Sequence, residues 1–240
     1  DLHSFPTRRS SDLPTVKESH MRKKGLLIVV SGPAGVGKGT LCKAYIKKFD
    51  DMKLSVSTTT RNPREGEKDG VEYNFTTIEN FKKMIENDDL LEYVNVFDNY
   101  YGTSKKWVEE QIDAGNDIIL EIDIVGAMNV KKVYNDAILI FLLPPSYEVL
   151  KSRLENRRTE NADQIQKRLS RMTQEINIMR DYDYFVVNDD LDDSLTLMKS
   201  IIDSQRCSVK RYGDEKIDCY LNTITVGRSE ERRVGKECRS

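Results

Sequence analysis

The run GPAGVGKGT, residues 32–40, contains the first residues whose types and spacing could do chemistry. It follows the pattern G-x-x-x-x-G-K. Glycines let a backbone curl so that successive N–H groups point at phosphate oxygens, and the start of a following helix adds the positive end of its dipole. A lysine in this position reaches the β- and γ-phosphates of a nucleotide and stabilises charge during transfer. The run therefore predicts a nucleoside triphosphate site with Lys38 as a catalytic residue.

The whole loop is expected to surround the phosphates of the nucleoside triphosphate, which the family resemblance described below identifies as ATP. Its residues are Gly32, Pro33, Ala34, Gly35, Val36, Gly37, Lys38, Gly39 and Thr40. Gly39 stands where the pattern usually has serine or threonine, so the ligand of a phosphate-bound Mg²⁺ ion is left open between Thr40 and Asp123, directly or through water. The alternative is an ordinary glycine turn before a helix, which the neighbouring elements disfavour.

A second candidate site lies in residues 57–75, STTTRNPREGEKDGVEYNF. Arg61 and Arg64 stand three residues apart around a proline, and guanidinium groups bind phosphate oxygens bidentately. The stretch has no hydrophobic periodicity and is too polar to be core. Two interpretations follow: a salt-bridged surface loop in which the arginines pair with Glu65 and Glu67, or a receptor for a second phosphate group.

Arginines also gather in residues 153–169, RLENRRTENADQIQKRL. Phosphoryl transfer spreads negative charge over the moving group, and mobile arginines that close on it lower the barrier and exclude water. A group of arginines that stabilises a transferring phosphoryl group is one interpretation. A charged helix face with i, i+4 ion pairs is the other.

The elements that must position these residues are short apolar strands alternating with helices. Residues 25–31, GLLIVVS, form a continuous apolar run, as expected of a strand buried on both faces of a parallel sheet. A helix is expected directly after the glycine loop. Further strands are predicted at 117–123, 137–143 and 182–188, and further helices at 125–134, 144–157, 162–179 and 190–205. The alternation predicts an α/β fold with a central parallel sheet covered on both faces.

Residues 54–104 break this rhythm and predict a small mixed α/β insertion after the first helix. Within it, strands are expected at 71–75 and 90–97 and a helix at 78–87. The expected domain is 21–206, with its core at 21–53 and 105–206, between a leader at 1–20 and a tail at 207–240.

Residues 1–13 and 228–240 are expected not to belong to the natural protein. One set of codons that encodes the first stretch also encodes the second when it is read as the reverse complement in a shifted frame. This DNA segment looks like a sequencing adapter. Both ends are therefore excluded from functional reasoning, and Met21 is the expected natural start.

Composition excludes several classes of function. The 240 residues are 38% hydrophobic and 32% charged with a formal net charge of −2, so nothing predicts a nucleic-acid binder or a polybasic membrane protein. No apolar run approaches the roughly eighteen residues of a membrane span. The four cysteines form no C-x-x-C pair and have no nearby histidine, which favours a reducing, cytoplasmic setting over a zinc site.

The stretch at 57–75 resembles the monophosphate-binding signature of the guanylate kinase family, T-[ST]-R-x-x-[KR]-x-x-[DE]-x-x-G-x-x-Y-x-[FY]. The chain matches its fixed positions at Thr59, Thr60, Arg61, Arg64, Glu67, Gly70, Tyr73 and Phe75. The resemblance extends over about residues 24–205, with the motifs in the family's order. It implies a P-loop NTPase three-layer fold with a central parallel sheet, a small mixed α/β GMP-binding insertion and a helical lid.

The resemblance also implies which residues hold the phosphate of GMP. They are Ser57, Arg61, Arg64, Tyr73 and Tyr101. For Tyr73 and Tyr101 the alternative is a place in the core as packed aromatic side chains.

Glu92 resembles the carboxylate that reads guanine, assisted by Thr103 and Ser57, with Asp123 near the guanine nucleotide. A carboxylate accepts from the N1–H and amino groups of guanine. Adenine has no N1 proton and would leave an acceptor unpaired. The alternative for Glu92 is a solvent-facing strand glutamate.

The stretch at 153–169 resembles the family's flexible lid, at about 154–165, and the helix after it. Within this stretch Arg157 and Arg168 resemble the catalytic arginines, with Arg153 as a further candidate. Asn188 resembles a position near adenine, although a strand-end cap also explains it. Val125 stands where the family often has glutamine, so no side-chain role is assigned to it.

The implied reaction is ATP + GMP to ADP + GDP, in purine nucleotide metabolism, with Mg²⁺ and by direct in-line transfer. ATP and GMP are the expected small-molecule partners. Neither nucleic acid nor membrane is expected, and the chain is either a monomer or a homo-oligomer. Two alternatives are a kinase for another phosphorylated acceptor and a catalytically inactive guanylate-kinase-like module that binds proteins.

Overall fold

The computed structural model of the chain describes residues 24–96, 98–156, 162–211, 217, 218 and 221. The chain divides into two units. Lys24–Ser204 is the unit that contains the sheets described below. The other unit comprises Asp1–Lys23 and Gln205–Ser240 and includes a short 3₁₀ helix, η4 (Val209–Arg211). The predicted leader at 1–20 and the adapter-like stretches lie outside the described residues.

A five-stranded parallel sheet lies at the centre of the Lys24–Ser204 unit. In spatial order its strands are β2 (Lys53–Leu54), β7 (Ile118–Glu121), β1 (Leu27–Ser31), β8 (Ile138–Leu143) and β9 (Tyr184–Val187). All five residues of β1 are buried, as are the first five of β8. Such continuous burial is what the apolar runs predicted for strands covered on both faces.

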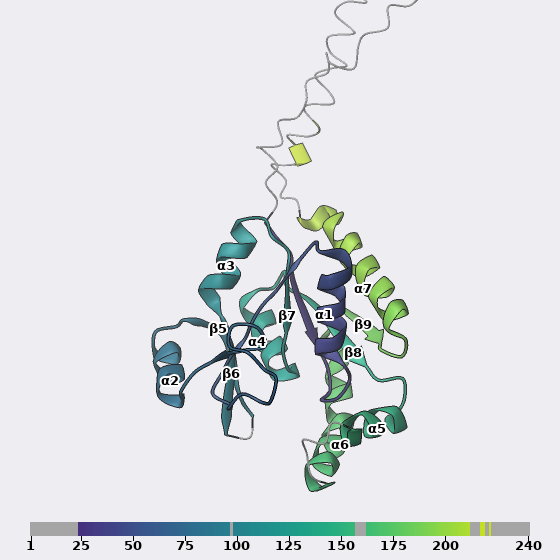
Figure 1. The fold of residues 1–240 in the computed structure, drawn as a ribbon. Coiled ribbons are helices and arrows are strands. Elements are labelled where there is room, and N and C mark those ends of the chain that lie inside the picture. The colour runs from purple at the N-terminus through teal and green to yellow at the C-terminus, as the bar shows by residue number, and fades with distance from the viewer. Residues whose placement is uncertain (1–23, 97, 157–161, 212–216, 219–220, 222–240) are drawn as a thin grey trace, which may run out of the picture. The chain divides into compact units, whose positions relative to one another are not determined.

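Helices cover both faces of this sheet (Figure 1). On one face lie α1 (Lys38–Phe49) and α7 (Leu191–Arg206), and on the other α3 (Lys105–Asp113) and α4 (Ile124–Val133). Alternate residues of β1 point to opposite faces, so Ile28 and Val30 pack under α1 and α7 while Leu27 and Val29 pack under α3 and α4. The predicted alternation of strands and helices is confirmed.

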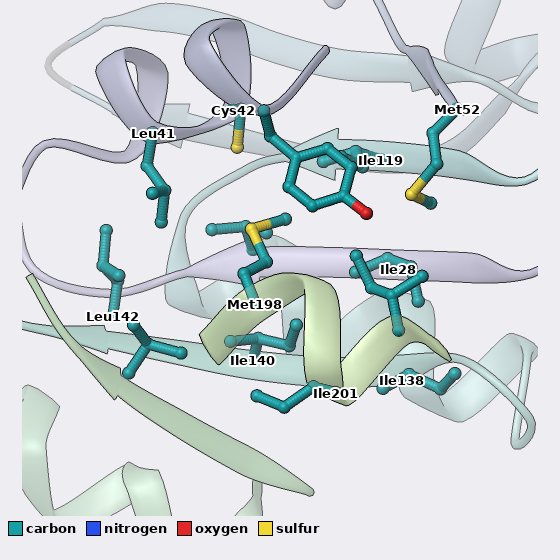
Figure 2. Close-up of a cluster of buried hydrophobic side chains, with 14 of the residues drawn as sticks. Ile28, Leu41, Cys42, Met52, Ile119, Ile138, Ile140, Leu142, Met198 and Ile201 are labelled. Carbon is teal, nitrogen blue, oxygen red and sulfur yellow. The ribbon is translucent and has the colours of Figure 1, made fainter. Parts of the chain in front are cut away.

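Figure 2 shows the first of these two hydrophobic clusters. Leu41 and Cys42 of α1 and Met198 of α7 surround strand residues such as Ile28 and Ile140. Each of these five side chains is fully buried. Burial of a large apolar side chain contributes roughly 1.5–3 kcal/mol, so this cluster fixes α1, and with it the loop before α1, to the sheet.

Residues 58–104 form a second, mixed sheet. In spatial order its strands are β4 (Asn74–Phe75), β3 (Thr58–Thr59), β6 (Asn99–Ser104) and β5 (Leu90–Val96). The helix α2 (Ile78–Glu86) is capped by Thr77, whose side chain accepts a hydrogen bond from the Asn80 N–H, and its Phe81 stacks on Tyr100 of β6. The helix α2 and the strand β5 match the predicted elements, whereas only Asn74–Phe75 of the strand predicted at 71–75 is a strand and β6 was not predicted.

One expectation for this insertion is wrong. The stretch at 57–75 was expected to be too polar to be core, yet Thr58 and Thr59 are buried. Both residues pair with β6, and the Thr59 hydroxyl donates to the Tyr100 carbonyl at 2.9 Å. A threonine can be buried here because β6 satisfies its polar groups.

The remaining helices are α5 (Tyr147–Asn156), α6 (Ala162–Asn177) and the 3₁₀ helix η3 (Ile178–Asp181). Leu150 and Leu154 of α5 pack with Leu169 of α6. The predicted lid at about 154–165 falls partly on residues 157–161, which lie outside the described residues. Among the described residues, no helix is both long enough and apolar enough to cross a membrane.

Candidate active site

The glycine loop connects β1 to α1. Gly32 has a φ of 145°, and a methyl group there would stand 2.3 Å from the Leu142 carbonyl oxygen, so only glycine fits. Gly37 has a φ of 99° and caps the start of α1. The Lys38 ammonium donates to the carbonyl oxygens of Gly32 at 2.7 Å and Pro33 at 3.2 Å. The lysine side chain therefore lies across the loop predicted to hold the phosphates.

Two side chains from elements distant in the sequence donate hydrogen bonds to the same carbonyl oxygen of this loop. The Asn188 amide donates to the Val36 carbonyl oxygen at 2.8 Å. The Arg153 guanidinium donates to the same oxygen at 3.3 Å and to the Asn188 carbonyl at 3.1 Å and 3.0 Å. Asn188 follows β9, and Arg153 lies on α5. In this conformation both residues therefore fix the backbone of the loop.

Glu121, the last residue of β7, lies beside the start of α1. A methyl group on Gly39 would stand 3.1 Å and 3.2 Å from its carboxylate oxygens. Burial raises the pKa of the Cys42 thiol, and the charge of Glu121 raises it further while Lys38 lowers it. Burial and the same carboxylate also raise the pKa of Tyr73 in the second sheet. The charge of Glu121 therefore acts on Cys42 of α1, behind the glycine loop, and on Tyr73 of the insertion.

The sequence interpretation overlooked Glu121. It extended the strand to Asp123, whereas β7 ends at Glu121 and Asp123 caps the start of α4. The available signal was a carboxylate closing a strand of the parallel sheet, since such strand ends face the ligand crevice. The unusual Gly39 now has a consequence, because its missing side chain leaves room for the Glu121 carboxylate.

Arg61 is held by an ion pair inside the insertion. Its Nη2 lies 2.9 Å from both carboxylate oxygens of Glu67, and its guanidinium lies over the rings of Tyr73 and Phe75 at 5.3 Å and 5.9 Å. Burial lowers the pKa of Arg61, but the hydrogen bond and charge of Glu67 outweigh it and the pKa is raised. Glu67 also accepts the Arg64 N–H at 2.7 Å. The salt-bridge interpretation therefore holds for Arg61.

The ion pair with Glu67 leaves part of the Arg61 guanidinium able to donate to another group. A guanidinium carries five N–H donors, and the contacts to Glu67 and Asn62 use Nη1 and Nη2 without consuming all five. Arg64 is exposed on the turn after β3. A carboxylate that orients an arginine leaves it able to bind an anion on its other edge.

The other residues predicted to hold a phosphate lie on the second sheet or next to its strands. Tyr73 and Tyr101 meet edge to face with ring centroids 6.0 Å apart. Tyr101 pairs with Thr59 across β3 and β6, and Ser57 comes directly before β3, with its carbonyl accepting the Asn74 N–H. Both tyrosines are partly exposed, so neither is a fully buried core aromatic.

Glu92 and Thr103 form a buried pair. They face each other across β5 and β6, and the Thr103 hydroxyl donates to Glu92 Oε1 at 2.8 Å. Glu92 is only 5% exposed, which rules out a solvent-facing strand glutamate. Burial raises the pKa of Glu92 to about 7, the bond from Thr103 opposes this, and the Asp123 carboxylate adds to the rise.

Asp123 approaches Glu92 from α4. Its Oδ1 accepts the Gly126 N–H at 2.7 Å, as a helix N-cap does. A methyl group on Gly126 would stand close to both carboxylates. Asp123 thus belongs with the buried pair in the second sheet, while Glu121 belongs with the glycine loop.

Three further residues were predicted to belong to the site. Thr40 is exposed in the first turn of α1. Arg168 lies half-buried on α6, next to Leu169 in the contact with α5. Arg157 lies outside the described residues.

A glycine loop at the carboxyl end of β1, with a lysine across it and a parallel sheet behind it, defines the P-loop NTPase fold. The arginines, tyrosines and buried carboxylate of the insertion have the chemistry that binding a phosphorylated acceptor requires. These two parts are those of a kinase for a small molecule.

Comparison with known proteins names the family. A family model described as guanylate kinase matches residues 24–205. The guanylate kinase of Caldanaerobacter subterraneus subsp. tengcongensis is 48% identical over 194 residues, covering 81% of this chain and 94% of that protein. That of Clostridioides difficile is 49% identical over 202 residues, covering 84% and 98%. The chain belongs to the guanylate kinase family.

A solved structure agrees. The crystal structure of guanylate kinase from Anaplasma phagocytophilum has a TM-score of 0.68 at 29% identity, covering 81% of this chain and 94% of that one. The predicted family, the P-loop NTPase fold and the assignment as a kinase are therefore confirmed.

The first prediction concerns the stability of the buried Glu92. Because its folded pKa is raised above the usual 4.5 to about 7, the unfolded chain loses this proton first as pH rises. The residue's contribution to folding free energy therefore becomes less favourable between about pH 4.5 and 7, by up to roughly 3 kcal/mol. In urea unfolding, the free energy of unfolding of Glu92→Gln relative to the parent chain should be higher at pH 8 than at pH 5. A difference that is independent of pH, or the same trend in the exposed Glu86→Gln, would contradict this.

The second prediction concerns the loop-holding Arg153. Arg153→Met removes the guanidinium bonds to Val36 and Asn188, and a lost charge-assisted bond corresponds to about a tenfold change in affinity. We expect the dissociation constant for ATP to rise by about that factor, measured by titration calorimetry. The matched control is Lys151→Met, an exposed residue of the same helix. Equal ATP affinities in the two variants would refute the role.

Proposed function

We propose that this chain transfers the γ-phosphoryl group of ATP to GMP, producing ADP and GDP. The observation that supports it best is the buried Glu92–Thr103 pair beside Asp123, because a carboxylate there can accept from guanine's N–H groups within the insertion that also carries Arg61. Membership of the guanylate kinase family supports the same reaction.

In the proposed acceptor site, Arg61 and Arg64 bind the phosphate of GMP, with Ser57, Tyr73 and Tyr101 around it. Glu67 has the positioning role: it holds the Arg61 guanidinium through two contacts and the Arg64 backbone through a third. Stacking of Arg61 over Tyr73 further limits its rotation. A cation held in place by its neighbours loses little conformational entropy when the phosphate arrives.

Guanine is proposed to be read by Glu92 in its ionised form. Two N–H donors on one edge of guanine match the two oxygens of a carboxylate, whereas adenine presents an unprotonated N1 there. Thr103 donates to Glu92 and so fixes the plane of the carboxylate. Burial and Asp123 disfavour the ionised form in the absence of ligand, so guanine's donors supply the favourable contacts that the site otherwise lacks.

ATP is proposed to bind at residues 32–40, with Lys38 stabilising charge on the transferring phosphoryl group. Among the described residues, no group of three or more histidine, cysteine, aspartate and glutamate side chains could hold a metal. Mg²⁺ in such sites is held by one or two protein oxygens together with phosphates and water. Glu121 beside Gly39 and the exposed Thr40 hydroxyl fit that pattern and would hold the ion. When bound, Mg²⁺ neutralises charge on the phosphate oxygens.

Arg157 and Arg168 are proposed as the lid arginines that stabilise the transferring group, without a covalent enzyme intermediate. Arg168 lies on α6, whose contact with α5 links it to the element that carries Arg153. A cytoplasmic setting is also proposed, from the scattered cysteines, and the chain acts as a monomer or a homo-oligomer.

The third prediction tests the reaction. ADP release measured with GMP, AMP, UMP and CMP as acceptors should be fastest with GMP, and Lys38→Met should abolish it while leaving GMP binding intact. Lys47→Met, an exposed lysine of the same helix, is the control. Faster turnover of AMP or UMP would instead support a kinase for another acceptor. Tight GMP binding without turnover in the parent chain would support a catalytically inactive module.

The fourth prediction tests the positioning of Arg61. Glu67→Gln keeps the shape of the side chain but removes the charge that orients the guanidinium. We expect KM for GMP to rise about threefold to tenfold with little change in KM for ATP, since surface ion pairs are weak but this pair is largely buried. Glu65→Gln, two residues away and exposed, should leave both unchanged. Equal effects of the two variants would show that Glu67 has no special role.

A further inference from the structure

We propose that Gly126 is a specificity-determining position, because its missing side chain makes the space that the Glu92 carboxylate occupies. The inference deepens the proposed function and rests on Glu92 as the guanine reader. Gly126 itself would not touch GMP, so it acts as a positioning residue through Glu92.

The geometry at Gly126 leaves no room for a side chain. A methyl carbon built on its backbone would stand 2.7 Å from Glu92 Oε2, 3.3 Å from Glu92 Cδ and 3.2 Å from Asp123 Oδ1. The first distance is far inside the roughly 3.5 Å at which non-bonded heavy atoms pack. The closest atom is therefore the oxygen assigned to guanine recognition.

Glu92 cannot simply swing away from such a methyl group. Its side chain is 5% exposed, and its Oε1 accepts the Thr103 hydroxyl at 2.8 Å. Its backbone belongs to β5, which pairs with β6 along its length and lies beside α4. Moving the carboxylate would either break the bond from Thr103 or displace a strand.

The backbone does not explain the glycine. Gly126 is the third residue of α4 and is not among the glycines with left-handed φ. In a helix, glycine is the poorest residue after proline, because it has the most conformational freedom to lose. The chain therefore keeps a weak helix former in the first turn of α4, where an alanine would otherwise strengthen the helix. The room taken by the Glu92 carboxylate accounts for it.

Gly126 thus fixes the direction of the carboxylate. Thr103 holds one oxygen, and the bare Cα of Gly126 lies behind the other. To accept two parallel N–H bonds from guanine, both carboxylate oxygens must lie in the plane of the base. A methyl group would rotate the carboxylate out of that plane, so recognition of the base weakens while the phosphate contacts of Arg61 and Arg64 remain.

The fifth prediction tests this arrangement with Gly126→Ala. We expect the dissociation constant for GMP to rise about tenfold and that for ATP to stay within twofold, both by titration calorimetry. Val125→Ala, the neighbouring exposed position of α4, is the matched control and should bind GMP as the parent does. Unchanged GMP affinity in Gly126→Ala, or an equal loss of GMP and ATP affinity, would overturn the inference.

A second readout does not depend on GMP. In the Glu92→Ala background the obstructing oxygens are gone, so Gly126→Ala should raise the urea midpoint of unfolding through better helix formation. In the parent chain the same change should lower the midpoint or prevent folding. If Gly126→Ala fails to fold alone but folds with Glu92→Ala, the inference stands; if both fail, or if the change has the same effect in both backgrounds, it is wrong.

The two readouts separate this inference from the proposed function. If the parent chain phosphorylates GMP but Gly126 and Glu92 show no energetic coupling, only the role of Gly126 fails. If the coupling is present but the parent chain does not use GMP, the packing stands, while the proposed function and the specificity role that rests on it both fail.

Discussion

The parallel pairing of β1 with β7 and β8 is the constraint on which the rest of the site depends. In register, Val30 lies beside Glu121 and Ser31 beside Phe141, so these strands end at the same edge of the sheet. The glycine loop, the Glu121 carboxylate and Asn188 after β9 all leave the sheet there. A parallel sheet concentrates its strand ends in this way, which makes the edge a ready site for phosphates.

Charge is divided between two parts of the same unit. The cations proposed to bind phosphates are Lys38 on the glycine loop and Arg61 in the insertion, the latter held by Glu67. The carboxylates proposed to lie at the base are Glu92 and Asp123, which approach each other at the start of α4. Glycine makes this possible at two places, since Gly39 leaves room for Glu121 and Gly126 for Glu92. A glycine in the first turn of each helix therefore lets a carboxylate approach the helix backbone.

Long apolar runs and spaced motifs were predictable from the sequence, whereas short or shared elements were not. The strands β1 and β8 follow from continuous apolar runs, because both of their faces are buried, and the helices α1, α4 and α7 follow from apolar residues at helical spacing, because each buries one face. The two-residue strand β3 was missed, since Thr58 and Thr59 are polar and their burial depends on pairing with β6. The helix α3 was also not predicted; it buries mainly Val108 and Ile112, too few for a clear period.

By itself, the sequence determined the glycine loop with Lys38, the alternating core and the family, because these depend on residues close together in the chain or on a fixed spacing. Only the tertiary structure decided that Arg153 and Asn188 grip the loop at Val36, that Glu121 faces Gly39, and that Glu92 rests on Gly126. Each of these contacts joins residues from different strands and helices. Such contacts arise from topology and packing, which no local pattern of residue types encodes.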